Sequence, residues 1–348
     1  MAIKKSVSLF VSLLMAVTLL AGCSSSPADS SVPDTSGAEN SQTVSTDEKT
    51  TVNVFALKGP TGVGMVNLMK ANDDKTAAND YQFRVVGSPD EITGKISSGE
   101  ADIAAVPTNL AAVLYKKTSG KVRMLAINTE GVLYMLENGD SISSVQDLKG
   151  KTIYTTGQGA NPEYTLKYIL EKNGLDPEKD VKIEFVTEND ELAVLLANGT
   201  AEVAMVPEPS VTTVMMQNEN LRVALDMTEE WDKVSDNGSK LLMGCVIART
   251  EFIEEHPEAV EAFLKEYKAS IEKCETDLEG SAALCETYEI IPKAAVAQKA
   301  LPNCNLTYIA GSEMKEQIAG YFEVLLAANP QSVGGALPDD EFYYGAAA

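Results

Sequence analysis

Histidine is almost absent from this chain, because His256 is the only one among 348 residues. It stands directly before Pro257 and Glu258, a pattern typical of a helix start, so we expect a solvated side chain there. A single histidine in such a place supports neither a His-dependent catalytic triad nor a His-bearing metal cluster. The sequence therefore favours binding over catalysis, with no metal ion and no cofactor.

Basic residues are also scarce, since 28 Lys and Arg stand against 51 Asp and Glu, for a net charge of −23. This excess argues against nucleic acid and against an anionic membrane surface as partners. The glycine-containing stretch 58–64 lacks the Gly-Lys-Ser/Thr of a P-loop, so it is not a phosphate cradle of that kind. The 44% hydrophobic and 23% charged content is that of a globular protein, with enough chain for two lobes that each have a core.

A marked apolar run lies near the start of the chain, from Val7 to Leu20, and it is too short and wrongly flanked for a spanning helix. Lys4 and Lys5 precede it, so residues 1–23 are predicted to be an export signal. Residues 20–23, Leu-Ala-Gly-Cys, match the bacterial lipobox, in which Cys23 becomes the lipidated first residue of the mature protein. The alternative is a plain secretory signal with a chance cysteine. Residues 24–50 are rich in Ser, Thr, Asp and Pro and predict a disordered tether.

The stretch 96–107 recurs one hundred positions later, at 196–207. Both copies contain a Gly, then an Ala and an acidic residue, and both end in Val-Pro. Each predicts a helix that ends at a left-handed Gly cap, followed by a short buried strand that a proline stops. The same register relates strands at 52–55 and 152–155. Because solenoid repeats are much shorter, about 20–50 residues, this period predicts two similar α/β lobes.

Strand and helix patterns alternate through 51–128 and again through 142–230, which predicts a mostly parallel sheet flanked by helices in each lobe. The apolar stretch 124–136, broken at Gly131, is predicted to cross into the second lobe, and the strand-like 240–248 to carry the chain back. The tail 334–344 should pack onto the first lobe. We therefore assign 51–130 and 245–348 to lobe 1, 131–244 to lobe 2, and two hinge crossings between them.

Taken in order, these features resemble the substrate-binding lipoproteins of ABC importers, in the branch of nitrate-, alkanesulfonate- and thiamine-precursor-binding proteins. The resemblance is carried by the lipobox with its tether, by 58–62, by the Gly-Glu-Ala-Asp…Val-Pro unit at 99–107, and by 251–260. It implies a type II periplasmic-binding-protein fold, in which two lobes close on a solute between them.

The resemblance also implies a function and partners. The protein would be a monomer, exported and lipid-anchored to the membrane, that delivers a small organic molecule or anion to a permease and its ATPase. Sulfonates, carboxylates and thiamine-precursor pyrimidines or related heterocycles stay open as solutes. A lipid-anchored sensor is the alternative from another class. A pyrimidine-synthesis enzyme homologue is a third, although enzymes of that kind use His and clustered Cys that are missing here.

Ligands of open parallel sheets bind outside the carboxyl ends of the strands, beside helix N-termini whose N–H groups are unpaired. Here those places are the loops after the two first strands and after the two Val-Pro stops. The predicted ligand-binding residues are Lys58, Gly59, Pro60, Thr61, Gly62, Gly64, Met65, Thr108, Asn109, Gln158, Gly159, Ala160, Asn161, Glu208 and Trp231.

Simpler interpretations of these residues stay open. The glycines of 59–64 could only form a tight turn, and Lys58 could be a solvated charge. Glu208 could make a salt bridge at the rim. Trp231, the only tryptophan, could pad the hinge instead of stacking on a solute.

Four cysteines follow Cys23, and an exported protein can oxidise them. Four cysteines allow three complete pairings, which sequence cannot distinguish. We favour a disulfide between Cys285 and Cys304, with Cys245 buried as a small apolar side chain.

Overall fold

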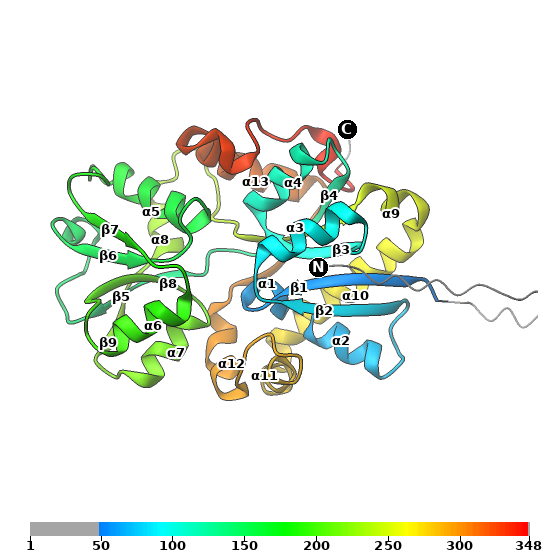
Figure 1. Cartoon of the computed structure of the whole chain (residues 1–348), viewed down its shortest axis with the longest axis horizontal. Helices are drawn as coiled ribbons and strands as arrows, with labels where there is room; N and C mark the ends of the chain where they lie inside the picture. Colours follow the sequence, from blue (N-terminus) through cyan, green and yellow to red (C-terminus); the bar gives the residue numbers. More distant parts are fainter. Residues whose placement is uncertain (1–48, 347–348) are drawn as a thin grey trace, which may run out of the picture. The chain divides into compact units, whose positions relative to one another are not determined.

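The computed structural model describes residues 49–346 (Figure 1). The predicted export signal, the lipobox cysteine Cys23 and nearly all of the tether lie outside the described residues. Within residues 49–346, no helix is long and apolar enough to cross a membrane.

Two separate sheets form the frame of the described chain. The first sheet has the order β11-β4-β10-β3-β1-β2, and the lobe built on it is called the first lobe. Its strands are β1 (Thr51–Leu57), β2 (Asp80–Val86), β3 (Ile103–Pro107), β4 (Val122–Thr129), β10 (Gly244–Arg249) and β11 (Leu306–Ala310). The first four run in the same direction, and β10 and β11 run against them.

The second sheet has the order β7-β6-β8-β5-β9 and defines the second lobe. Its strands are β5 (Leu133–Asn138), β6 (Thr152–Thr155), β7 (Lys182–Phe185), β8 (Val203–Pro207) and β9 (Leu221–Asp226). Only β5 runs against the others. Both sheets are therefore mixed, because β5 and β10 each enter from the other lobe, past the carboxyl ends of the neighbouring strands. The predicted two-lobed α/β fold is confirmed.

Helices flank both sheets (Figure 1). The first lobe carries α1 (Pro60–Val63), α2 (Val66–Asp73), α3 (Pro89–Ser98), α4 (Thr108–Lys117), α9 (Thr250–Glu255), α10 (Pro257–Thr276), α11 (Leu278–Thr287), α12 (Ala294–Ala300) and α13 (Gly311–Ala328). The second lobe carries α5 (Asn161–Lys172), α6 (Asn189–Ala197), α7 (Ser210–Gln217) and α8 (Met227–Val234). Short 3₁₀ turns lie at Val145–Leu148, Leu301–Asn303, Pro330–Val333 and Asp340–Phe342.

The internal repeat of the sequence appears directly in the backbone. α3 ends at Gly99 with φ 77°, and α6 is followed by Gly199 with φ 73°, both in the left-handed region. The buried strands β3 and β8 follow, and each ends in proline. Glycine is needed at these two positions because a Cβ would strain that backbone conformation.

The two crossings run side by side between the lobes. The first joins β4 to β5 through residues 130–132, and the second joins α8 to β10 through residues 235–243. The N–H of Met243 donates to the carbonyl of Thr129 at 3.0 Å, which ties the crossings together. Residues 240–243 are not part of a strand, so the predicted return strand begins only at Gly244. The tail packs on the first lobe as predicted, since the N–H of Tyr344 donates to the carbonyl of Met124 at 2.9 Å.

Candidate functional site

Four loops meet where the lobes face each other. They follow β1 and β3 in the first lobe and β6 and β8 in the second, at the carboxyl ends of these strands. A Cβ placed on Gly59 would lie 3.8 Å from Cδ of Pro209, so the loops after β1 and β8 nearly touch. The loops after β3 and β6 also meet, because Asn161 Nδ2 lies 3.5 Å from Thr108 Oγ1. The structure thus brings the predicted loops together from both lobes.

The starts of α4 and α5 form the centre of this meeting point. Neither helix has a side-chain cap at its N-terminus, where Pro107 and Ala160 stand. Asn161 is 2% exposed and its Nδ2 makes only long contacts, to Thr108 Oγ1 and, at 3.4 Å, to the Met243 carbonyl. Its Oδ1 is buried and has no hydrogen-bond partner among residues 49–346. A buried polar atom without a partner is costly, so this oxygen points to a missing hydrogen-bond donor.

The second crossing fixes the start of α4. The N–H of Thr108 donates to the Met243 carbonyl at 3.1 Å, and its hydroxyl donates to the Leu242 carbonyl at 2.7 Å. Asn109 is buried beside it. These two hydrogen bonds tie the second crossing to the loop after β3.

The loop after β1 combines exposed and core positions. Gly59 has φ +89° and donates its N–H to the Ile290 carbonyl at 2.9 Å, while Pro60 and Thr61 are partly exposed. Asn128, at the end of β4, donates to the Thr61 carbonyl at 3.1 Å and so holds the loop. Sequence reasoning missed Asn128, although an asparagine inside an apolar strand is a usable signal.

Lys58, Gly62, Gly64 and Met65, which were also predicted to bind the solute, have contacts with their own lobe. The Lys58 ammonium is solvated and lies 3.9 Å from Glu289 of its own lobe. A Cβ on Gly62 would fall 2.0 Å from the Leu57 carbonyl oxygen, and one on Gly64 would fall 2.8 Å from Ile271. Packing therefore explains both glycines, and Met65 is completely buried.

Glu208 follows β8 and is buried, with 2% exposure. Its Oε2 accepts from the Thr212 N–H at 3.1 Å, and its Oε1 accepts from the Thr212 hydroxyl at 2.9 Å and from Asn303 Nδ2 at 3.5 Å. Burial raises the pKa of Glu208, although these hydrogen bonds act in the opposite direction. Asn303 belongs to the first lobe, and its carbonyl also accepts from the Tyr134 hydroxyl at 3.1 Å. Glu208 is thus part of a polar link between the lobes.

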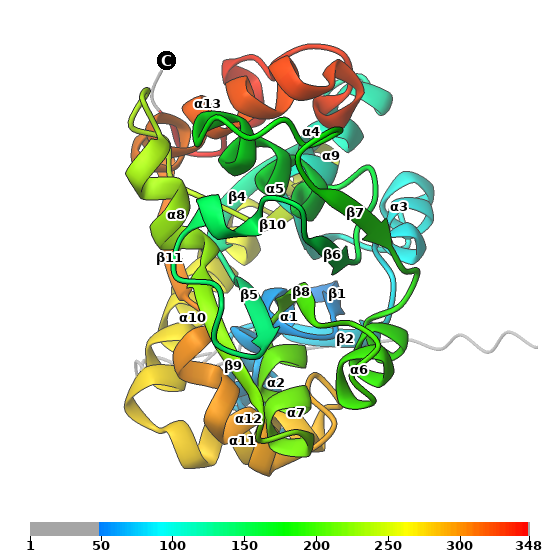
Figure 2. The same ribbon diagram turned by 90° about the vertical axis from the view of Figure 1, so that its left-hand side faces the viewer.

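A cavity of about 690 Å³ adjoins Glu208. It lies on the side where α7 contacts α12, which Figure 2 shows at the bottom of the view. Its volume suits a small organic molecule. It is lined by Tyr134, Glu208, Val211, Thr212, Met215, Met216, Glu219, Val223, Lys299 and Asn303.

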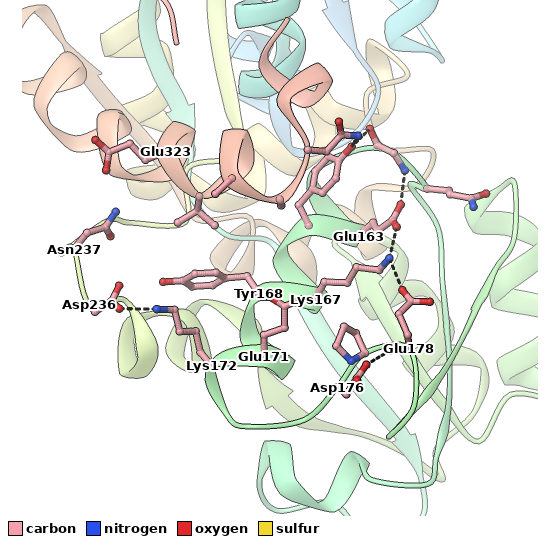
Figure 3. Close-up of a pocket in the computed structure, with 18 residues that line it drawn as sticks. Glu163, Lys167, Tyr168, Glu171, Lys172, Asp176, Glu178, Asp236, Asn237 and Glu323 are labelled. Carbon is pink, nitrogen blue, oxygen red and sulfur yellow. Dashed lines mark hydrogen bonds and ion pairs between the residues drawn. The ribbon is translucent and has the colours of Figure 1, made fainter. Parts of the chain in front are cut away.

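A larger cavity, of about 1100 Å³, lies between α5 and α13 (Figure 3). Of the predicted site residues it reaches Gln158 and Gly159. Both lysines of its lining are paired: Lys167 Nζ lies 2.9 Å from both Glu163 and Glu178, and Lys172 Nζ lies 2.5 Å from Asp236. The Gly159 N–H donates to Glu163 at 2.7 Å. Because both lysines of this cavity are already paired, we place the solute at the helix N-termini and not here.

Trp231 requires a correction, because it is completely buried and a solute cannot stack on it in this structure. Its ring packs 4.4 Å from that of Tyr168 on α5 and 5.4 Å from that of Tyr321 on α13. Its Nε1 donates to the Ser239 carbonyl at 3.0 Å. Trp231 therefore packs beside the second crossing, in agreement with the alternative interpretation that it fills space at the hinge.

The predicted disulfide also requires a correction. Cys285 and Cys304 are free thiols in the structure, as are Cys245 and Cys274, and all four are buried. They pack in the first lobe as small apolar side chains, and burial raises the pKa of Cys285 to about 12. A thiol that stays protonated is a poor nucleophile, so it is oxidised slowly.

No metal-binding cluster of three or more His, Cys, Asp or Glu side chains occurs within residues 49–346. His256 is exposed at the start of α10, at the place expected from its neighbour Pro257.

Comparison with known families identifies the chain. The model of the family described as NMT1/THI5 like matches residues 87–277, which is more than half of the chain. The chain therefore belongs to the NMT1/THI5-like family. No curated protein matches it.

Solved structures share the fold across both lobes. An ABC transporter protein from Parabacteroides distasonis is 22% identical, with a TM-score of 0.72 over 84% of this chain and 98% of that chain. The periplasmic aliphatic sulphonate binding protein SsuA from Escherichia coli is 14% identical, with a TM-score of 0.67 over 83% and 92%. The periplasmic nitrate-binding protein NrtA from Synechocystis PCC 6803 is 15% identical, with a TM-score of 0.54 over 74% and 69%. At these identities the similarity concerns the fold, and it confirms the predicted type II periplasmic-binding-protein architecture.

Proposed function

We propose that this protein is the solute-binding component of an ABC importer, acting outside the cytoplasm as a monomer. It captures a small organic molecule between its lobes and delivers it to a permease and its ATPase. The family match and the fold shared with named sulphonate- and nitrate-binding proteins support this function. No catalytic step is proposed, because the single histidine is an exposed helix-start residue.

One observation carries the proposal: the uncapped starts of α4 and α5 meet from opposite lobes around the buried, unpartnered Oδ1 of Asn161. Helix N–H groups supply donors to a solute, and Asn161 supplies an acceptor. A solute that touches both lobes stabilises the closed form, because only differential affinity for that form drives closure. The residues proposed to contact it are Gly59, Pro60, Thr61, Thr108, Asn109, Gln158, Gly159, Ala160, Asn161 and Glu208.

Replacing Asn161 by alanine is expected to weaken solute binding about five- to tenfold, because one buried hydrogen bond contributes about 1 kcal/mol. The measurement is native mass spectrometry of the folded protein incubated with a small-molecule extract of the producing cells. The wild type should carry one small molecule per chain.

Asn198→Ala is the matched control, because Asn198 is exposed and follows α6. It should bind like the wild type. Binding that is equally strong in Asn161→Ala, or the lack of any bound small molecule on the wild type, would contradict the proposed function.

We also propose that Cys23 carries a lipid that anchors the protein to the cell membrane, with residues 24–50 as the tether. Its support is the Leu-Ala-Gly-Cys motif after a charged and then apolar start. Cys23→Ser should shift the protein from the membrane fraction to the soluble fraction without changing its melting temperature. A Cys23→Ser protein that stays bound to membranes would show a different anchor.

A further inference from the structure

We propose that the solute presents a cationic nitrogen group, an amine, amidine or guanidine, to the carboxylate of Glu208. This inference rests on the proposed function and names the solute class from Glu208, one of the residues proposed to contact the solute.

The chain supplies a cation to each of its other buried carboxylates. Among the residues of 49–346 whose side chains the structure describes, four acidic side chains are buried, which are Asp102, Glu137, Glu208 and Glu230. Asp102 pairs with Arg249 at 2.7 Å, Glu137 with Arg222 at 2.6 Å, and Glu230 with Lys233 at 2.7 Å. Within the described chain, Glu208 alone of the four forms no ion pair. A buried charge without an opposite charge is expensive, so a partner from outside the chain accounts for it best.

The hydrogen bonds of Glu208 leave room for that partner. Its three donors, two on Thr212 and one on Asn303, are all neutral, and the Asn303 contact is long at 3.5 Å. An ionised carboxylate has about four acceptor positions, and Oε2 accepts a single hydrogen bond here. Burial, which raises the pKa of Glu208, would be offset by a cation placed on this oxygen.

Two backbone N–H groups near helix starts, which could otherwise donate to an anionic solute, already donate to carboxylates of the chain. At the start of α7, Glu208 takes the Thr212 N–H that would otherwise face an anion. At the loop before α5, Glu163 takes the Gly159 N–H. The Glu208 carboxylate has no ion pair among the described residues and therefore repels an anion, whereas the charge of Glu163 is balanced by Lys167 at 2.9 Å. The solute is therefore a cation, unlike the sulphonate and nitrate anions for which two of the structural neighbours are named.

The adjoining cavity fits an organic cation. Its lining includes the apolar side chains of Val211, Met215 and Val223, which suit a hydrocarbon body. The charged groups on its lining besides Glu208 are Glu219 and Lys299, both exposed at the rim. Burial raises the pKa of Tyr134 and of Cys304, which are also close to Glu208.

A simpler role for Glu208 is to cap the start of α7. Glu208→Gln separates the two roles, because glutamine keeps a side-chain oxygen for the Thr212 N–H but loses the charge. If Glu208 only caps α7, the Glu208→Gln variant binds a cation as tightly as the wild type does. If Glu208 binds the cation of the solute, the variant loses cation binding.

The experiment measures binding of two pairs of probes by isothermal titration calorimetry at pH 7. Benzamidine is paired with benzoate, and propylamine with propanesulfonate, so that each pair has one shape and opposite charges. Wild type, Glu208→Gln and Glu202→Gln are compared. Glu202 is exposed at the opposite end of β8, so its variant removes the same charge away from the site.

We expect at least one cationic probe to bind wild type and Glu202→Gln alike, and to bind Glu208→Gln at least tenfold more weakly. Neither anion should bind the wild type. Anions that bind the wild type, cation binding unchanged in Glu208→Gln, or no cation binding at all would each overturn the inference.

The mass-spectrometry experiment separates this result from failure of the proposed function. A molecule bound from the extract that has no basic nitrogen overturns the cationic class and leaves solute binding standing. If no molecule binds from the extract, the proposed function itself fails.

Discussion

Replacement of Trp231 by alanine lowers the free energy of unfolding by about 3–5 kcal/mol, since it empties a completely buried site that nearby side chains fill only partly. The indole lies between Tyr168 on α5 of the second lobe and Tyr321 on α13 of the first. The loss is therefore felt by both lobes at once. Urea unfolding followed by circular dichroism measures it without depending on tryptophan emission.

Trp231→Phe is the matched variant, because it keeps an aromatic ring but leaves the Ser239 carbonyl without its Nε1 donor. It should lose less, about 1–3 kcal/mol. If alanine at 231 costs under 1 kcal/mol, the side chain is not in the core, and stacking of Trp231 on a solute becomes tenable again.

Gly62→Ala is expected to destabilise the protein by about 3 kcal/mol or more, because the added Cβ would lie 2.0 Å from the backbone oxygen of Leu57. A backbone atom cannot rotate away as a flexible side chain can, so β1 or α1 must shift. Thermal unfolding of the purified variant measures the effect.

Gly159→Ala provides the comparison within the other loop. A Cβ there meets nothing within 4 Å, so the cost comes only from the φ of +73° and should be about 1–2 kcal/mol. Equal stability of Gly62→Ala and wild type would contradict the close packing of the loop after β1.

The sequence predicted much of the fold because the informative residues are local. Gly99 and Gly199 end helices in the left-handed conformation, and the Val-Pro pairs end buried strands, so the repeat alone located β3 and β8. The order of strands was not predictable in this way. β10 lies beside β3, more than a hundred residues away, and an apolar run does not reveal its neighbours or its direction.

The site was predictable as a set of loops but not as a set of contacts. Asn161 and Thr108 were expected near a solute from their place after strands, and the structure brings them within 3.5 Å. That Glu208 lacks a cation could not be foreseen, since a glutamate between two prolines looks like an exposed turn residue. The burial of Cys245 was predicted correctly, whereas Trp231 and the Cys285–Cys304 disulfide were mispredicted, because their surroundings depend on helices α10 to α13, which fold back from the end of the chain.

Hydrogen–deuterium exchange of the solute-loaded and solute-free protein tests the central claim, that one small molecule binds between the lobes at the strand ends. We predict slower exchange in both lobes, at 58–62 and 108–112 in the first and at 158–165 and 208–213 in the second. Protection confined to one lobe, or confined to α5 and α13 around the larger cavity, would contradict the account.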